Sequence, residues 1–158
     1  IRTKSKSLMF VKKNKDSAWS RPAMADYILL FSAPGDNPEP VLTDVTNEEW
    51  ICWARPIWYG ISESDTLNAA LARDEKDERH ICPLQLPTIE RCVRLWSNAG
   101  DVVFDPFAGV ASTGYVAVRH GRKFQGIELK PSYFRAGVNN LHSADSEKSQ
   151  QSLFSRCE

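Results

Sequence analysis

Residues 102–114 read VVFDPFAGVASTG and contain the strongest structural signal in the chain. A short apolar strand ends in Asp105, a bend of small residues follows, and a helical pattern starts at Ser112. In an open parallel α/β sheet, ligands bind where such strands end, because the next helix begins there with unpaired N–H groups. Gly109 has no side chain, so a ligand can come close to the backbone of this bend. The stretch therefore predicts a ligand-binding strand–turn–helix unit.

Helices and strands alternate on both sides of this unit. Apolar residues at helical spacing predict a helix that begins at Pro87 and stops at residues 98–100. A strand over 101–105 and a helix over 112–120 follow, and then a second strand over 124–128 and a last helix from 130 toward Leu141. This order predicts a parallel α/β domain with right-handed crossovers.

The remaining segments have weaker patterns. The apolar run at 26–31, closed by the turn residues 33–38, predicts a buried strand. The stretch 48–59 is too irregular for a helix or a strand, and its tryptophans, Trp50, Trp53 and Trp58, are expected in the core. Residues 62–79 are polar and predict a loop or a frayed helix, and the polar residues beyond Asp145 predict a disordered tail.

Composition is that of an ordinary globular protein, with 42% apolar and 25% charged residues among 158. No run approaches the roughly 18 apolar residues of a membrane span, so we expect a soluble protein without a membrane partner. The four cysteines form no CxxC pair, which favours core thiols in a reducing, cytoplasmic setting. Residues 1–21 hold seven basic side chains against one acid, which fits a phosphate-contacting arm and a solvated end equally well. The first residue is not Met, which suggests a fragment or a processed chain.

Two acids narrow the choice of ligand. Glu128 follows Gly109 by nineteen positions, close to the ~20 at which such folds place an acid on ribose hydroxyls, and Asp105 can accept hydrogen bonds from an ammonium group. A dinucleotide would need GxGxxG, and a P-loop would need Lys where Tyr115 stands. S-adenosylmethionine offers an ammonium, a carboxylate and a ribose, which two acids and helix N-terminal amides can meet. The ring of Phe107 is expected to pack on its adenine.

Several blocks of this sequence resemble the N4-cytosine and N6-adenine DNA methyltransferases, in the permuted order that places the cofactor motif after the catalytic one. The blocks are 105–109, 121–128 and 133–134, and the phage-type members are also matched by 24–31, 34–38 and 77–85. The resemblance implies a partial Rossmann-like α/β fold of S-adenosylmethionine-dependent methyltransferases. We expect a basic arm over 1–25 left from the upstream catalytic and target-recognition region, a cofactor-binding domain over 26–145 and a polar tail over 146–158.

The same resemblance implies which residues hold the cofactor, with Glu128 on the ribose and Cys82, Pro83 and Gln85 at the methionine end. The full expected set is Asp105, Pro106, Phe107, Ala108, Gly109, Ser112, Glu128, Leu129, Cys82, Pro83 and Gln85. The chain departs from many relatives, which have His at position 82, Lys at 86 and Ser-Gly-Thr-Thr at 110–113. A metal site at His80 and Cys82 is not expected because no second ligand pair exists, and His120 and His142 are expected on the surface without partners.

The family's catalytic tetrapeptide, an Asp, Ser or Asn followed by Pro-Pro and an aromatic residue, occurs nowhere in these 158 residues. The resemblance implies methyl transfer to adenine N6 or cytosine N4 of double-stranded DNA, with the base flipped out of the duplex. We therefore expect the chain to hold the cofactor and to be catalytically silent by itself. The alternatives are an inactive nucleotide- or DNA-binding module, a methyltransferase for another substrate, and, less favoured, a nicotinamide oxidoreductase.

Overall fold

The structure is a computed structural model that describes residues 27–42, 44–62, 64–67 and 83–154. The chain divides into two compact units, Ile1–Pro38 and Glu39–Glu158. In the first unit, residues 27–38 form neither helix nor strand, and Tyr27 and Phe31 are 86% and 83% exposed. The prediction of a buried strand at 26–31 is therefore wrong for its described residues. An apolar run becomes a strand only where a neighbouring strand takes up its hydrogen bonds, and the sheet of the described residues lies wholly in the second unit.

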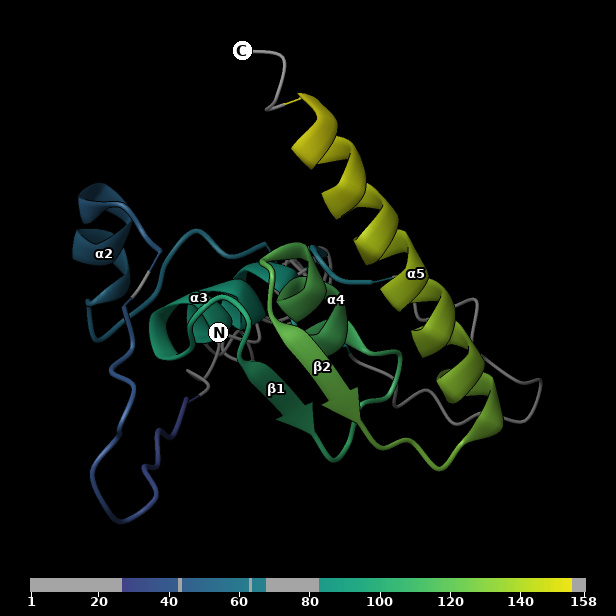
Figure 1. The fold of residues 1–158 in the computed structure, drawn as a ribbon, viewed down its shortest axis with the longest axis horizontal. Helices are drawn as coiled ribbons and strands as arrows, with labels where there is room; N and C mark the ends of the chain where they lie inside the picture. Colours follow the sequence, from purple (N-terminus) through teal and green to yellow (C-terminus); the bar gives the residue numbers. More distant parts are fainter. Residues whose placement is uncertain (1–26, 43, 63, 68–82, 155–158) are drawn as a thin grey trace, which may run out of the picture. The chain divides into compact units, whose positions relative to one another are not determined.

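The second unit contains the predicted α/β arrangement (Figure 1). Its elements are α2 (Asn47–Trp53), α3 (Leu86–Trp96), β1 (Val102–Asp105), α4 (Ser112–Arg119), β2 (Lys123–Gly126) and α5 (Pro131–Phe154). The two strands are parallel, with Val102 opposite Lys123 and Asp105 opposite Gly126. The expected order of helices and strands from Pro87 onward is confirmed. Strand β2 ends at Gly126, earlier than predicted, so Glu128 lies in the loop that follows it.

Helix α4 lies at the centre of this unit, in contact with α3, α5 and both strands. Ile89 and Val93 of α3 are buried against Val116 of α4, and Val103 of β1 packs beside them. These α3 residues are four positions apart and face the same side of the helix, as the sequence pattern predicts. The core therefore fixes the start of α4, and with it the bend that precedes α4.

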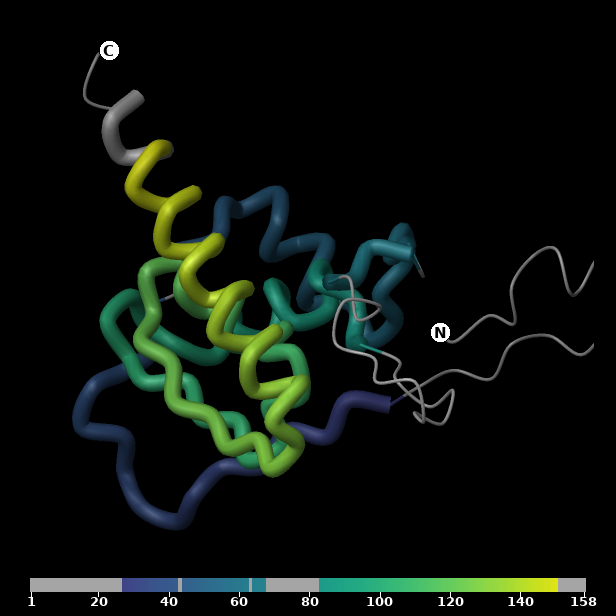
Figure 2. Tube along the Cα trace, turned by 90° about the vertical axis from the view of Figure 1, so that its right-hand side faces the viewer, coloured from purple at the N-terminus to yellow at the C-terminus, as the bar shows by residue number. Residues whose placement is uncertain are grey.

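Helix α5 continues to Phe154, so the predictions of a helix end near Leu141 and of a disordered tail are wrong for the described residues. Residues 138–154 contain no Gly or Pro to stop a helix. The hydroxyl of Tyr115 on α4 lies 3.0 Å from both carboxylate oxygens of Glu147, and Arg119 lies 3.4 Å from one of them. Figure 2 shows α5 extending past the elements it packs on. Through these contacts α4 binds α5 as far as Glu147, which lies beyond the predicted helix end near Leu141.

The stretch around the tryptophans, predicted to be irregular, contains helix α2. Thr46 and Glu49 form a reciprocal capping box at its start, a signal that the sequence contained. Trp50 is 52% exposed, so its expected core position is wrong, because it projects from a short helix with no buried residues. Trp53 and Trp58 are half-buried, and the Trp58 indole N–H donates to the Trp53 carbonyl at 2.6 Å.

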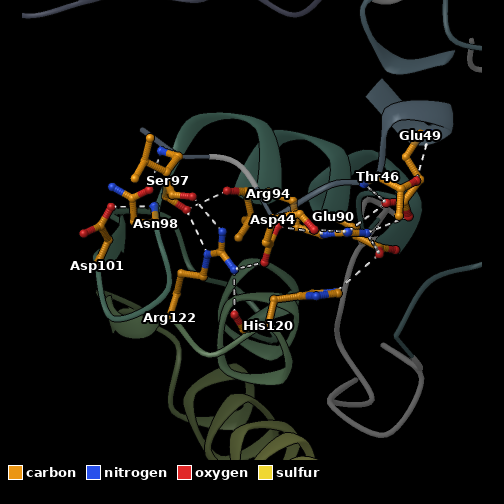
Figure 3. Close-up of polar contacts among 12 residues, drawn as sticks. Asp44, Thr46, Glu49, Glu90, Arg94, Ser97, Asn98, Asp101, His120 and Arg122 are labelled. Carbon is orange, nitrogen blue, oxygen red and sulfur yellow. Dashed lines mark hydrogen bonds and ion pairs between the residues drawn. The ribbon is translucent and has the colours of Figure 1, made fainter. Parts of the chain in front are cut away.

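A buried arginine ties the residues before α2 to the rest of the unit (Figure 3). The fully buried side chain of Arg122 donates to the carbonyls of Ser97 and His120, at 2.6 and 2.7 Å, and to Asp44 Oδ2 at 2.7 Å. Arg94 pairs with the same Asp44 at 3.2 Å and with Glu49 at 2.9 Å. Burial alone would raise the pKa of Asp44, but the hydrogen bonds and charges of Arg122 and Arg94 outweigh it and lower that pKa.

His120 belongs to the same network, so the prediction that it has no partner is wrong. Its Nε2 lies 3.4 Å from Glu90 Oε1 of α3, and the side chain is half-buried. Burial lowers the pKa of His120 and outweighs the opposing effect of Glu90. His142 is exposed, as expected. Within the described ranges, no helix has both the length and the apolar character that crossing a membrane requires.

Candidate functional site

A cleft of about 300 Å³ opens where β1 ends. It is walled by the start of α3, the bend after β1, the first residues of α4 and the first turn of α5. The lining residues are Pro83, Leu84, Ile89, Asp105, Phe107, Ala108, Gly109, Val110, Ser112, Thr113 and Tyr133. Its position at the carboxyl end of a parallel strand is where open α/β sheets bind ligands.

The bend itself has two residues in the left-handed region, Gly109 at φ +56° and Ala111 at φ +60°. The Ala111 N–H donates to the Ala108 carbonyl at 2.7 Å, which closes a tight turn directly before α4. Among the described residues, no side chain caps the N-terminus of α4. The first N–H groups of α4 therefore lie at the cleft with a partial positive charge, which suits an anionic ligand group.

The two predicted acids both hold the bend. Asp105 Oδ1 accepts the Phe107 N–H at 2.9 Å. Glu128 Oε2 accepts the Gly109 N–H at 2.8 Å, and its other oxygen accepts the Lys130 N–H at 2.8 Å. Gly109 and Glu128, nineteen positions apart in the sequence, are therefore in direct contact, which joins the bend to the loop after β2. The arrangement places two carboxylates beside a glycine turn, one at the end of β1 and one in the loop after β2.

The cleft brings together six of the residues predicted from the sequence, namely Pro83, Asp105, Phe107, Ala108, Gly109 and Ser112. The Phe107 ring is exposed beside the cleft, and Ser112 is buried beneath it. Four other predicted residues, Pro106, Gln85, Glu128 and Leu129, are outside the lining. Gln85 precedes α3 and its carbonyl accepts the Ile89 N–H, while Leu129 faces solvent. Cys82 lies outside the described residues.

Five lining residues were missed: Leu84, Ile89, Val110, Thr113 and Tyr133. Tyr133 stood in a block that resembles the methyltransferases, which was a usable signal. Its ring packs against Val110, and the Lys130 ammonium lies 4.4 Å from the ring centroid. The contact of α5 with the bend could not be predicted because helix periodicity does not show what a helix face covers.

A resident metal ion would need several ligand side chains that lie together. The part of the chain that the structure describes contains no group of three or more His, Cys, Asp or Glu side chains placed to hold one. His80 and Cys82 lie outside that part, so the structure adds nothing about them.

The known proteins that this chain is similar to are DNA methyltransferases. A family model described as DNA methylase, covering the N6 and N4 enzymes, matches residues 3–139. The DNA adenine methyltransferase YhdJ of Escherichia coli K12 is 44% identical over 70 residues, which are 43% of this chain and 24% of YhdJ. The type II methyltransferase M.BglI of Bacillus subtilis is 32% identical over 142 residues, which are 82% of this chain and 37% of M.BglI.

Solved structures show the same likeness. The protein TTHA0409 of Thermus thermophilus, described as a candidate DNA modification methylase and crystallised with S-adenosyl-L-methionine, is 29% identical. It superposes with a TM-score of 0.54, and the match covers 71% of this chain and 41% of TTHA0409. The chain thus spans less than half the length of each of these three relatives.

Proposed function

The chain belongs to the N6/N4 DNA methylase family, and from that premise we propose that it forms the S-adenosylmethionine-binding part of a DNA amino-methyltransferase. The whole enzyme would transfer a methyl group to N6 of adenine or N4 of cytosine in double-stranded DNA, in the cytoplasm of a bacterium or an infected cell. When bound, S-adenosylmethionine supplies an electrophilic methyl group on a sulfonium.

The observation that carries this proposal is the pair of carboxylates flanking the Gly109 bend at the cleft. Asp105 would accept the ammonium of the methionine end, and Glu128 would accept the ribose hydroxyls with the lone pairs that the Gly109 and Lys130 N–H groups do not use. The exposed ring of Phe107 would cover the adenine. The uncapped start of α4 would face the methionine carboxylate. Each chemical group of the cofactor thus has a matching group beside the cleft.

The open sheet supports the view that this is part of a larger enzyme. Val102 and Phe104 are more than half exposed on one face of β1, whereas parallel sheets are normally covered on both faces. We propose that the part of the methylase carrying the catalytic tetrapeptide packs on this face. Residues 1–25 would be the basic arm toward DNA and 26–145 the cofactor domain. Helix α5 runs through the proposed boundary with the 146–158 tail.

Calorimetric titration tests the cofactor assignment. The wild-type chain is expected to bind S-adenosylmethionine and S-adenosylhomocysteine and to leave NAD unbound. The double variant Asp105→Asn, Glu128→Gln is expected to lose at least tenfold in affinity, because amides replace two charge-assisted hydrogen-bond acceptors. A double variant of exposed acids, Glu48→Gln, Asp145→Asn, is the matched control and should bind as wild type. Unchanged affinity in the Asp105/Glu128 variant, or binding of NAD alone, would remove the assignment.

One observation favours a second reading, a DNA- or nucleotide-binding module without catalysis. The catalytic tetrapeptide is absent from these 158 residues. The two readings differ in what the complete gene encodes, because an active enzyme must carry that tetrapeptide elsewhere. Sequencing the complete gene separates them: a gene without the tetrapeptide supports the inactive module.

A further inference from the structure

One face of α5 holds the bend at the cofactor cleft. Tyr133 and Ala136 pack against Val110, and Gly137 lies against Ala111. One turn further along, the Asn140 side-chain amide donates to the Val110 carbonyl at 2.8 Å. Positions 133, 136, 137 and 140 share one side of a helix, so the bend is covered by a single stripe. Asn140 is the member of this stripe whose side chain makes a hydrogen bond to the bend.

That hydrogen bond fixes one peptide group. The Val110 carbonyl and the Ala111 N–H belong to the same planar unit, and the N–H donates to the Ala108 carbonyl at 2.7 Å. Both polar ends of this peptide are therefore held, one from α5 and one from within the bend. Rotation of the unit would break both hydrogen bonds at once.

The fixed peptide leads directly into a strained residue. Ala111 has φ 60° and ψ 41°, a left-handed conformation that costs a residue with a Cβ of the order of 1–2 kcal/mol. Its carbonyl accepts the Tyr115 N–H at 2.8 Å and so starts the hydrogen bonding of α4. The conformation of Ala111 thus sets the direction in which the first N–H groups of α4 point at the cleft.

We infer that Asn140 is a positioning residue of the cofactor site, acting through the Val110–Ala111 peptide and without lining the cleft itself. The inference rests on the proposed function, because it takes the ligand of the cleft to be S-adenosylmethionine. The role needs a hydrogen-bond donor opposite a carbonyl. A carboxylate of the same size, which has no donor, would repel that carbonyl.

The test uses this 158-residue chain with three variants, Asn140→Leu, Asn140→Asp and Asn139→Asp. Asn139 is the exposed neighbour on α5 and controls for a new charge at this point of the helix. Both Asn140 variants are expected to bind S-adenosylmethionine about tenfold more weakly than wild type, and Asn139→Asp is expected to bind equally well. If the leucine variant does not fold, the aspartate variant, which keeps the size and polarity, decides. Affinity unchanged in the folded Asn140 variants overturns the inference.

Rescue distinguishes positioning from general support of the fold. Glycine adopts the left-handed conformation without the Cβ penalty, so in an Ala111→Gly background the loss caused by Asn140→Asp should shrink to about threefold or less. The same tenfold loss in both backgrounds would show a role that does not pass through Ala111.

Amide hydrogen exchange without ligand provides the separate check on the proposed function. The Ala111 N–H should exchange faster in Asn140→Asp than in wild type and Asn139→Asp, because its peptide is no longer held. Equal exchange in all three overturns the positioning role whatever binds. If exchange responds as expected but wild type binds no S-adenosylmethionine, the proposed function fails instead, and the link of Asn140 to that cofactor fails with it.

Discussion

Gly137 of α5 lies against Ala111 of the bend after β1 so closely that a Cβ added to Gly137 would be 3.2 Å from the Ala111 Cβ. The same added atom would lie 3.5 Å from the Gly109 carbonyl oxygen. Ala111 is buried and its backbone cannot move without disturbing the start of α4. The absence of a side chain at position 137 is therefore what lets α5 cover the bend.

Gly137→Ala is expected to destabilise the chain by about 1–2 kcal/mol, because crowding the buried Ala111 in a fixed bend costs more than the roughly 1 kcal/mol that Ala gains over Gly in a helix interior. Adding Ala111→Gly should recover part of the loss, because that change removes the opposing methyl and suits the left-handed conformation. Urea unfolding of the two single variants and the double variant measures this coupling. Strictly additive losses would mean that the two positions do not press on each other.

Arg122→Met is expected to cost about 2–4 kcal/mol, because it leaves two carbonyls and Asp44 without the guanidinium that pairs them. Arg119→Met, at the partly exposed arginine that pairs with Glu147, serves as control and should cost under about 1 kcal/mol. Chemical denaturation of both variants gives the comparison. An equal, small loss for the two arginines would contradict the structural weight assigned to Arg122.

Stability should fall with acidification in two windows. The folded pKa of His120 is below its ordinary 6.5, so the unfolded chain binds the proton first and stability drops as pH falls from about 6.5 toward that folded value. Asp44 and Glu49 have folded pKa values below 3.8 and 4.5, and their contribution, present above those values, is lost as pH falls through the folded ones.

The midpoint of thermal unfolding, measured at several pH values between 7 and 3, reports the loss of stability in both pH ranges. His120→Gln should remove the slope of the upper window and keep that of the lower one, whereas the exposed His142→Gln should leave both in place. If His120→Gln titrates like wild type above pH 5, His120 is not the group responsible.

The two described cysteines should differ in reactivity. Burial raises the pKa of Cys92 to about 11, so little thiolate forms at neutral pH. Cys52 is exposed, so the prediction that it lies in the core is wrong. Labelling with iodoacetamide at pH 7.5, followed by peptide mass spectrometry, is expected to modify Cys52 at least tenfold faster. Similar rates at the two thiols would contradict the packing around α3.

The 158-residue chain by itself should transfer no methyl group to DNA, since it lacks the tetrapeptide that would hold the flipped base. Incubation with tritiated S-adenosylmethionine and duplex DNA measures this directly, with a complete family member as the positive control. Incorporation above background would show that residues of this chain perform the transfer.

The sequence alone determined the parts of this protein that depend on near neighbours. The strand ending in Asp105, the small-residue bend, helix α4 and the second strand follow from short-range patterns, and the spacing of Gly109 and Glu128 indicated a shared site. Such patterns work because one βα unit determines where its own turn lies. The resemblance to the DNA methyltransferases implied further residues, Pro83 among them, so that six of the predicted residues line the cleft. The family itself is confirmed.

The elements that cover this unit come from distant parts of the chain and are known only from the folded structure. The stripe of α5 over the bend, the buried Arg122 bonded to Asp44 and the pairing of His120 with Glu90 all join residues from separate elements. The apolar run at 27–31 failed as a strand for the same reason, because strand formation needs a partner that periodicity does not supply. Local spacing shows which face of an element is apolar, but burial depends on what packs there, and that is a property of the folded chain.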